Sequence, residues 1–336
     1  MHVFELTRRL IDIESITPNE REIGNFLWKL LSEMADRFDG NAERMPVESD
    51  RDNIFVHFDQ PVVVLSTHMD TVPPFIPSSQ DNEDIWGRGA CDTKGIMAAM
   101  IAAAERLLAA GHRHFGLLFV VGEERNSAGA LVAAQNPRGS RFLVNGEPTE
   151  NKLALGSKGA LRYEIIARGH MAHSAYPELG ESAIEKLLDA LERIRRIELP
   201  ADDVLGPSTL NIGTIRGGRA PNVIADQAMA EIFVRVAGDI SRIRQKVKNA
   251  AEPDVAAKEV LMIPSAHLRA LEGFETTVVA FTTDIPAFGG AWGEPFLIGP
   301  GSIHVAHTAE ERISKSELLD SVALYQRLVE RLSSSA

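Results

Sequence analysis

The chain has 336 residues, of which 44% are hydrophobic and 24% are charged, a composition typical of a globular protein with room for two domains. The net charge of −12 argues against nucleic acid or an anionic membrane as a partner. No signal-peptide core or membrane-spanning run is found and Cys91 is the only cysteine, so we expect a cytoplasmic protein.

The N-terminal half of the chain predicts alternating helices and strands. Thr17-Pro18-Asn19-Glu20 has the spacing of a capping box, so a helix is expected to begin there. Nearly continuous apolar segments are typical of parallel strands that are covered on both faces. Four such segments occur, at 61–65, 115–121, 141–144 and 296–298. The Ala-rich segment 95–110 predicts a crossover helix, and the alternation predicts a doubly wound α/β sheet.

The middle of the chain predicts a separate α+β unit. Its predicted strands are 161–167, 209–215, 228–236 and 260–263, and its predicted helices are 181–197 and 240–251. The order β-α-β-β-α-β is typical of a ferredoxin-like fold. We therefore expect a catalytic domain at 1–157 and 265–336, which ends in a helix at 316–332, and an inserted ferredoxin-like domain at 158–264.

Polar side chains follow the predicted strands and precede the crossover helix. Ligands of open α/β sheets bind just beyond the carboxyl ends of the strands. Asp70 comes two residues after His68 and is well placed to orient that imidazole. The side chains expected to converge at this edge are His68, Asp70, Asp92, Glu123, Glu124, Glu147, and His304 or His307.

Carboxylates gathered this closely would repel one another and favour protonation unless cations bind between them. Two divalent cations would remove this conflict if Asp92, Glu124 and Glu147 were ligands. Mixed imidazole and carboxylate ligands suit zinc, with cobalt or manganese able to substitute. For the adjacent pair Glu123-Glu124, one metal ligand and one general base is the simplest division of roles.

Five segments occur in the same order as the motifs of a known family. They are His68-Met-Asp-Thr-Val-Pro, Gly87-Arg-Gly-Ala-Cys-Asp-Thr-Lys-Gly, Glu123-Glu124, Gly146-Glu-Pro-Thr and Ala306-His-Thr-Ala-Glu-Glu. Together they resemble the dinuclear zinc amidohydrolases, which include acetylornithine deacetylase, succinyl-diaminopimelate desuccinylase, carboxypeptidase G and the aminoacylases. The resemblance spans nearly the whole chain and implies two Zn²⁺ ions per chain, for which Co²⁺ or Mn²⁺ could substitute.

The resemblance also implies a role for each residue at this edge. Asp92 would bridge the two metals, and Glu123 would be the general base. The terminal ligands would be His68 and Glu147 on one metal, and Glu124 and His307 on the other.

Two segments of the inserted domain resemble family motifs as well. The segment from Gly169 to Pro177 resembles the one whose histidine, here His173, stabilises the oxyanion, typically in the partner subunit's site. Gly217-Gly218-Arg-Ala-Pro-Asn222-Val-Ile, with Arg235 on the next strand, resembles a cradle for a substrate carboxylate. The family uses this domain as a lid and for dimerisation, so the resemblance implies a homodimer. The chain departs from the family pattern at Gly122 and Ala225.

These features predict hydrolysis of an amide bond in a small N-acyl amino acid or a short peptide. Deacylation of an N-acyl amino acid is the first expectation, because Asp92-Thr-Lys-Gly and Gly146-Glu-Pro-Thr look most like the biosynthetic deacylases. A di- or tripeptidase or a carboxypeptidase of the same family is the alternative. A non-catalytic binding protein is a remote alternative, since Glu123 and all five ligand positions are present. The acyl group and the amino-acid side chain remain open.

Overall fold

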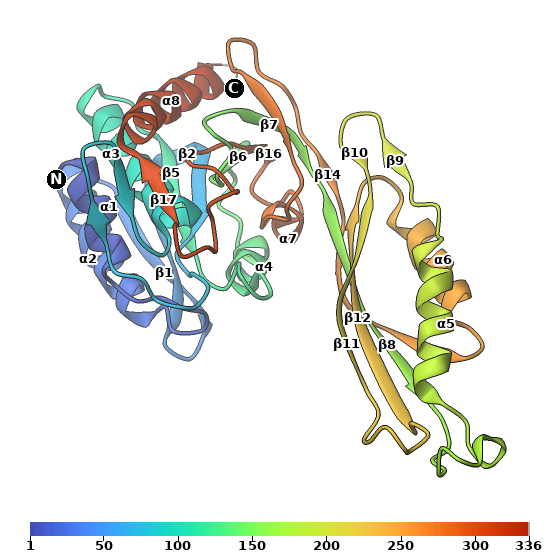
Figure 1. The fold of residues 1–336 in the computed structure, drawn as a ribbon. Helices are drawn as coiled ribbons and strands as arrows, with labels where there is room; N and C mark the ends of the chain where they lie inside the picture. Colours follow the sequence, from blue (N-terminus) through green and yellow to red (C-terminus); the bar gives the residue numbers. More distant parts are fainter. Residues whose placement is uncertain (335–336) are drawn as a thin grey trace. The chain divides into compact units, whose positions relative to one another are not determined.

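The computed structural model describes residues 1–334 and divides the chain into two compact units (Figure 1). Unit 2 comprises Gly156–His267 and Val278–Thr282, and unit 1 comprises the remaining segments. These limits lie a few residues from the expected ones, except that 278–282 was expected in the catalytic domain. Within unit 2, the Lys158 N–H donates to the Val279 carbonyl oxygen of this segment at 3.2 Å. The short strands β7 (Leu153–Ser157), β14 (Ala266–His267) and β15 (Thr276–Val279) form a sheet of order β14-β7-β15.

Unit 1 is built on a five-stranded sheet whose strands include the four predicted apolar segments. The strand order is β1-β2-β6-β16, and β5 also pairs with β2. The chain turns within β2 at Asp59, where φ is +54°, and the parts before and after this turn both pair with β5. The strands are β1 (Asn41–Glu48), β2 (Arg51–His68), β5 (His114–Val120), β6 (Phe142–Asn145) and β16 (Glu294–Leu297).

Helices cover both faces of this sheet, as expected for a doubly wound α/β fold. One face packs against α1 (Val3–Ile11), α2 (Arg21–Phe38), α3 (Gly95–Ala109) and α8 (Lys315–Ser334). The other face packs against α4 (Ala128–Gln135) and α7 (Ile285–Phe288). The smaller elements are β3 (Ser79–Gln80), β4 (Asp84–Trp86), β17 (Arg312–Ser314) and the π-helical turn η1 (Ala90–Lys94).

The predicted capping box at the start of α2 is wrong. The helix begins at Arg21, and no side chain caps it. The Thr17 hydroxyl instead donates to Asp70 Oδ2 at 2.7 Å. Glu20 accepts hydrogen bonds from Arg51 Nε at 2.7 Å and Nη2 at 2.6 Å. Both side chains therefore contact a distant buried charge, Thr17 that of Asp70 and Glu20 that of Arg51, because a buried charge must be paired or hydrogen-bonded.

Unit 2 has the predicted β-α-β-β-α-β order and a four-stranded antiparallel sheet of order β11-β12-β8-β13. Its elements are β8 (Gly159–Arg168), α5 (Ala183–Arg195), β11 (Thr209–Gly217), β12 (Gln227–Val236), α6 (Ile240–Ala251) and β13 (Val255–Ile263). The two helices bury one face of the sheet, which confirms the ferredoxin-like fold. Short segments are η2 (Pro177–Leu179), β9 (Ala201–Asp202) and β10 (Gly206–Pro207).

In the described part of the chain, residues 1–334, no helix is both long and apolar enough to cross a membrane.

Candidate metal centre

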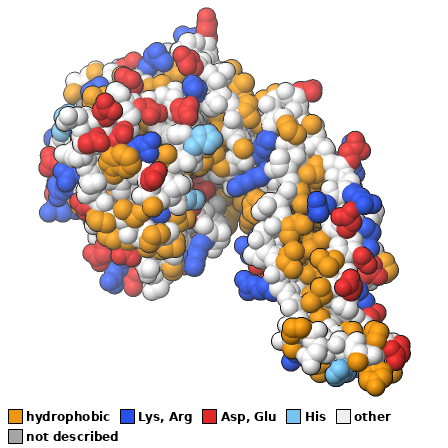
Figure 2. All heavy atoms as spheres, viewed as in Figure 1, with side chains coloured by type: hydrophobic (Ala, Val, Ile, Leu, Met, Phe, Trp, Pro, Cys, Tyr) orange, Lys and Arg blue, Asp and Glu red, His pale blue; other side chains and the backbone are white. Residues whose placement is uncertain are grey.

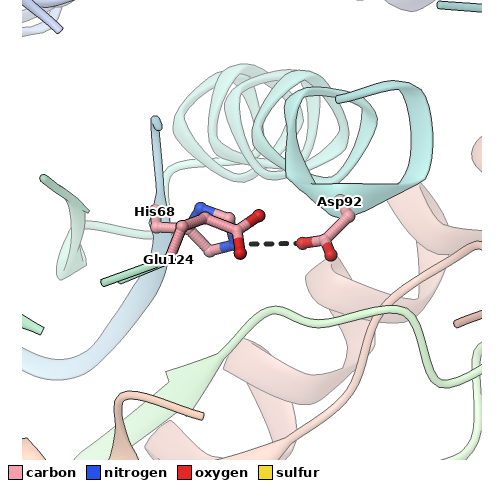
Figure 3. Close-up of side chains that lie close together, drawn as sticks. All are labelled: His68, Asp92 and Glu124. Atoms are coloured by element: carbon pink, nitrogen blue, oxygen red, sulfur yellow. Dashed lines mark hydrogen bonds and ion pairs between the residues drawn. The ribbon is translucent and has the colours of Figure 1, made fainter. Parts of the chain in front are cut away.

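Three side chains from distant parts of unit 1 converge at the end of the central strand. His68 is the last residue of β2, Asp92 lies in η1, and Glu124 follows β5. Potential ligand atoms of these three residues all lie within 4.8 Å of one another (Figure 3). The carboxyl ends of neighbouring parallel strands meet at one edge of a sheet, which is why residues so far apart in sequence gather here.

Asp92 lies between two histidines. Its Oδ1 atom is 3.0 Å from His68 Nε2, and its Oδ2 atom is 3.2 Å from His307 Nε2. His307 Nε2 is also 3.0 Å from Glu124 Oε1, so of His304 and His307 the latter belongs to the group. Burial opposes ionisation of Asp92, but the hydrogen bonds to His307 and His68 outweigh it, and the pKa of Asp92 lies below its ordinary value. The contacts with Asp92 and Glu124 raise the pKa of His307 to about 10.

Glu147 is a buried carboxylate of the group with an oxygen that is unpartnered in the described residues. It follows β6, is 4% exposed, and its Oε1 atom has no hydrogen-bond partner within residues 1–334. Burial, together with the negative charges of Asp92 and Asp284, raises the pKa of Glu147 well above its ordinary value. An unpartnered buried carboxylate is costly, and a bound cation would remove that cost. Two imidazoles and three carboxylates are a donor set that fits zinc.

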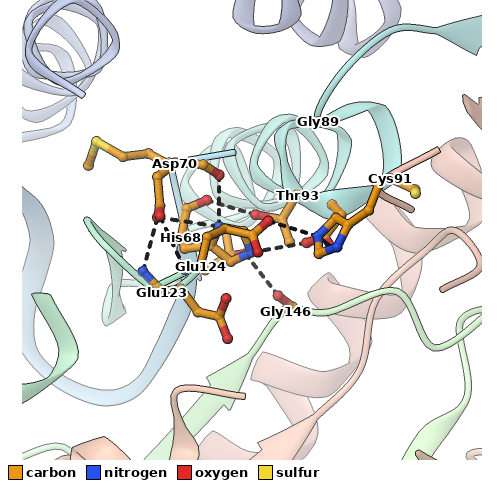
Figure 4. A network of polar contacts seen from close by, with 12 residues as sticks. His68, Asp70, Gly89, Cys91, Thr93, Glu123, Glu124 and Gly146 are labelled. Atoms are coloured by element: carbon orange, nitrogen blue, oxygen red, sulfur yellow. Dashed lines mark hydrogen bonds and ion pairs between the residues drawn. The ribbon is translucent and has the colours of Figure 1, made fainter. Parts of the chain in front are cut away.

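Glu123 and Glu124 have different surroundings. The Glu124 carboxylate contacts His307, whereas the Glu123 carboxylate points away from His68 and Glu124 in Figure 4. Burial and the nearby Glu147 raise the pKa of Glu123 well above its ordinary value, although His68 opposes the shift. A carboxylate with a raised pKa beside a cation site is suited to accept and release protons near neutral pH.

Asp70 contacts both His68 and the backbone of the loop that carries the two glutamates (Figure 4). Its carboxylate accepts hydrogen bonds from the backbone N–H groups of Gly122, Glu123 and Glu124 at 2.9, 3.1 and 3.2 Å. The Nδ1 atom of His68 is 2.9 Å from the Asp70 carbonyl oxygen and 3.5 Å from its carboxylate. Burial raises the pKa of Asp70, but hydrogen bonds outweigh burial, and that pKa lies below its ordinary value. Asp70 therefore has more partners than the sequence predicted.

Gly122, one of the two departures from the family pattern, lies against a buried ion pair. Its φ is +81°, and a Cβ atom there would lie 3.0 Å from the Arg51 guanidinium. Arg51 makes two hydrogen bonds to Glu20. A side chain at position 122 would therefore meet this ion pair and need an unfavourable backbone conformation.

Sequence reasoning assigned no role to Arg88 and Glu311, which join the Asp92 loop to the His307 loop. Glu311 Oε1 accepts hydrogen bonds from the N–H groups of Gly89 at 2.9 Å and Asp92 at 3.3 Å. Glu311 Oε2 accepts from Arg88, which also lies 3.5 Å from the His307 carbonyl oxygen. Both residues lie inside the quoted motifs, which is the only sequence signal for them.

Asp284 was also missed. It is 2% exposed, and its Oδ1 atom has no hydrogen-bond partner within residues 1–334. Burial is the main cause that raises its pKa to about 7, and its charge acts on Glu123 and Glu147. Asp284 lies outside every recognised motif and reaches the site only through the fold.

The predicted site residues of unit 2 fall into two places. His173 is exposed and forms a β-bridge with Val223, next to Asn222. The N–H of Ser174 donates to the Asn222 carbonyl oxygen at 3.0 Å, so these two loops lie together. Arg235 lies near the C-terminal end of β12, with its guanidinium 4.7 Å from the centre of the Phe233 ring.

Two minor expectations concern single side chains. His170 was expected to face solvent, and it is exposed. Cys91 was expected to be a packed residue, and it is fully buried with its sulfur 3.7 Å from the Ser302 carbonyl oxygen.

Comparisons with known proteins agree with this geometry. Residues 64–331 match the model of peptidase family M20/M25/M40. A peptidase M20 domain-containing protein of Schizosaccharomyces pombe is 38% identical over 98% of this chain and 84% of its own. A probable carboxypeptidase of Aspergillus fumigatus is 37% identical over 96% of this chain and 85% of its own.

The fold is shared with solved structures. An aminopeptidase PepT from Bacillus cereus superposes with a TM-score of 0.81 at 19% identity, covering 98% of each chain. The family match covers the strands and loops that bring His68, Asp92 and Glu124 together. The chain therefore belongs to peptidase family M20/M25/M40 and is a metal-dependent hydrolase of peptide or amide bonds.

Proposed function

We propose that the protein is a cytoplasmic two-metal exopeptidase that removes the C-terminal residue of short peptides. The arrangement of Asp92 between two imidazoles supports the metal chemistry. The names of the fungal relatives, probable carboxypeptidases that match over 96% of this chain, favour peptides over N-acyl amino acids. The order of preference expected from sequence, with deacylation first, is thus reversed.

Two Zn²⁺ ions per chain are proposed, with Co²⁺ or Mn²⁺ able to substitute. His68 and Glu147 would hold one ion, Glu124 and His307 the other, and Asp92 would contact both. Asp92 supports this division because each of its oxygens faces a different histidine. When bound, such ions polarise a carbonyl group and lower the pKa of water.

The remaining steps are proposed for side chains of this chain. Glu123 would take a proton from the attacking water and pass it to the leaving amine, which its raised pKa favours. Asp70 would keep the Glu123-Glu124 loop in place through three backbone hydrogen bonds.

Unit 2 would supply the substrate contacts. His173 would stabilise the oxyanion in the partner's site of a homodimer formed through this unit, and Asn222 and Arg235 would bind the substrate carboxylate. The pairing of the His173 and Asn222 loops supports a joint role. Arg235 has no acidic partner within residues 1–334, which leaves its charge for a carboxylate.

A substrate panel tests this proposal. Dipeptides and tripeptides, their C-terminally amidated forms, and acetyl and succinyl amino acids are compared with added Zn²⁺ or Co²⁺. We expect hydrolysis of the peptides with a free carboxyl group, release of the C-terminal amino acid, and little hydrolysis of the amides. Faster hydrolysis of an acetyl or succinyl amino acid than of every peptide would instead support the deacylase.

A further inference from the structure

The face of the unit 2 sheet opposite α5 and α6 carries arginines at neighbouring positions. Arg168 of β8 lies opposite Gln227 of β12, and Arg216 of β11 lies opposite Met229 of β12. Directly opposed residues of antiparallel strands point to the same face, and residues two apart on a strand do so too. Arg168 and Arg216 therefore point to one face from the two strands that flank β12.

Both arginines line a single pocket of about 500 Å³, together with Arg219. Arg219 is already paired, with nitrogens 3.1 and 2.9 Å from the Asp226 carboxylate. Asp226 is the only acidic residue among those that line the pocket. Arg168 and Arg216 are exposed, and neither makes an ion pair with an acidic side chain in the described residues. Three arginines against one aspartate leave an excess of positive charge.

Positive charge also exceeds negative charge on the rest of this face. Arg162 lies near the start of β8 and Arg235 near the end of β12, at the end of the sheet away from the pocket. Neither has an acidic partner in residues 1–334. Glu164 and Glu231 lie opposite each other on the middle of the face, and Glu164 is bound to Lys258 at 2.9 Å. In a chain with a net charge of −12, a face with four unpaired arginines is a local reversal of charge.

We propose that Arg168 and Arg216 form a binding pocket for the side-chain carboxylate of an acidic peptide. This deepens the proposed function and rests on it, since it gives the substrate class as short peptides that contain Asp or Glu. A guanidinium presents two parallel N–H groups that match a carboxylate. Ile166 and Met229 also line the pocket and suit the aliphatic part of such a side chain. The acidic charge of the whole chain disfavours a nucleic acid at this pocket.

Binding of fluorescein-labelled triglutamate and trialanine to the metal-free protein tests the pocket without hydrolysis. Arg168→Gln/Arg216→Gln is compared with Arg195→Gln/Arg242→Gln, which removes two charges from exposed arginines on the helices of the same unit. We expect triglutamate to bind more tightly than trialanine. The first double variant should lose about tenfold in triglutamate affinity, and the second should lose little. Added salt should weaken binding to the wild type.

Two results would overturn the pocket: equal binding of the two peptides, or equal losses in the two double variants. Hydrolysis by the zinc-loaded protein separates this inference from the proposed function. Peptide hydrolysis with unchanged triglutamate binding in Arg168→Gln/Arg216→Gln overturns the pocket and leaves the exopeptidase. Specific triglutamate binding without hydrolysis of any peptide overturns the exopeptidase and leaves the pocket.

Discussion

The neighbouring glutamates after β5 differ in the groups that they contact. Glu124 Oε1 is 3.0 Å from His307 Nε2, whereas no hydrogen bond of the Glu123 carboxylate occurs in residues 1–334. Glu123→Gln should therefore keep its metal and lose about 10²–10⁴-fold in kcat, because an amide cannot accept the proton. Glu124→Gln should instead weaken metal binding. Metal content and kcat are measured for both variants. Metal loss in Glu123→Gln but not in Glu124→Gln would show that the two roles are the reverse of those proposed.

Buried carboxylates also make the stability of the metal-free protein depend on pH. Burial raises the pKa of Glu123 and Glu147 well above the ordinary value, and that of Asp284 to about 7. A group whose folded-state pKa is raised stabilises the fold at low pH, and this contribution is lost as pH rises through the folded-state value.

The Tm of the metal-free protein should therefore fall between about pH 5 and 7, and the gain in Tm on adding Zn²⁺ should grow over the same range. Asp284→Asn should flatten the fall, since an amide does not ionise. Thermal unfolding at several pH values measures this. A metal-free Tm that rises from pH 5 to 7 would show that these carboxylates are not buried as described.

At the scale of elements, the Asp92 and His307 loops are joined by the Arg88–Glu311 pair. Glu311→Gln leaves Arg88 buried and unpaired, which typically costs about 3–5 kcal/mol, so it should lower both the Tm and the zinc affinity. Arg88→Met/Glu311→Leu should recover much of the Tm. It should not recover zinc affinity, because a leucine at position 311 offers no acceptor to the Gly89 and Asp92 N–H groups, which the amide oxygen of Glu311→Gln still does.

Zinc competition and thermal unfolding on the same preparations separate the two effects. Full recovery of zinc affinity in the double variant would mean that the pair serves stability alone.

The apolar strands of unit 1 could be predicted because burial on both faces requires continuous hydrophobic runs. β1 was not predicted, since Met45 is its only buried residue. The start of α2 was misplaced because Thr17 and Glu20 have partners far along the chain. Local spacing cannot show such partners.

In the candidate site, too, some residues could be recognised from local sequence, whereas others depend on contacts between distant parts of the chain. His68 and Glu124 could be placed in it because each lies at or just beyond the end of an apolar strand, and a family motif favoured His307 over His304. Asp284 could not be placed, because only the folded chain brings it near Glu123 and Glu147.

At the scale of the whole molecule, the proposed homodimer makes a prediction about shared sites. His173→Ala and Glu123→Gln should each give inactive protein. When the two variants are co-expressed and pair at random, half of the dimers contain one chain of each kind. In each of these dimers, one site would combine an intact Glu123 with the intact His173 of the other chain. Activity should then return to about one quarter of wild type.

Activity of the whole co-expressed population, purified without separating the three kinds of dimer, measures this. A mixture that stays as inactive as its parents would show that His173 serves its own chain, or that the chains do not share sites.

The proposed two-metal centre is tested most directly by titrating metal-free protein with Zn²⁺ while measuring both bound zinc and hydrolysis of a dipeptide. Five candidate ligands, with Asp92 facing a different histidine through each oxygen, suit two ions and exceed the usual four ligands of one. Bound zinc should approach two equivalents per chain, and activity should reach its maximum only as the second site fills. Full activity with bound zinc constant at one equivalent would contradict the two-metal centre.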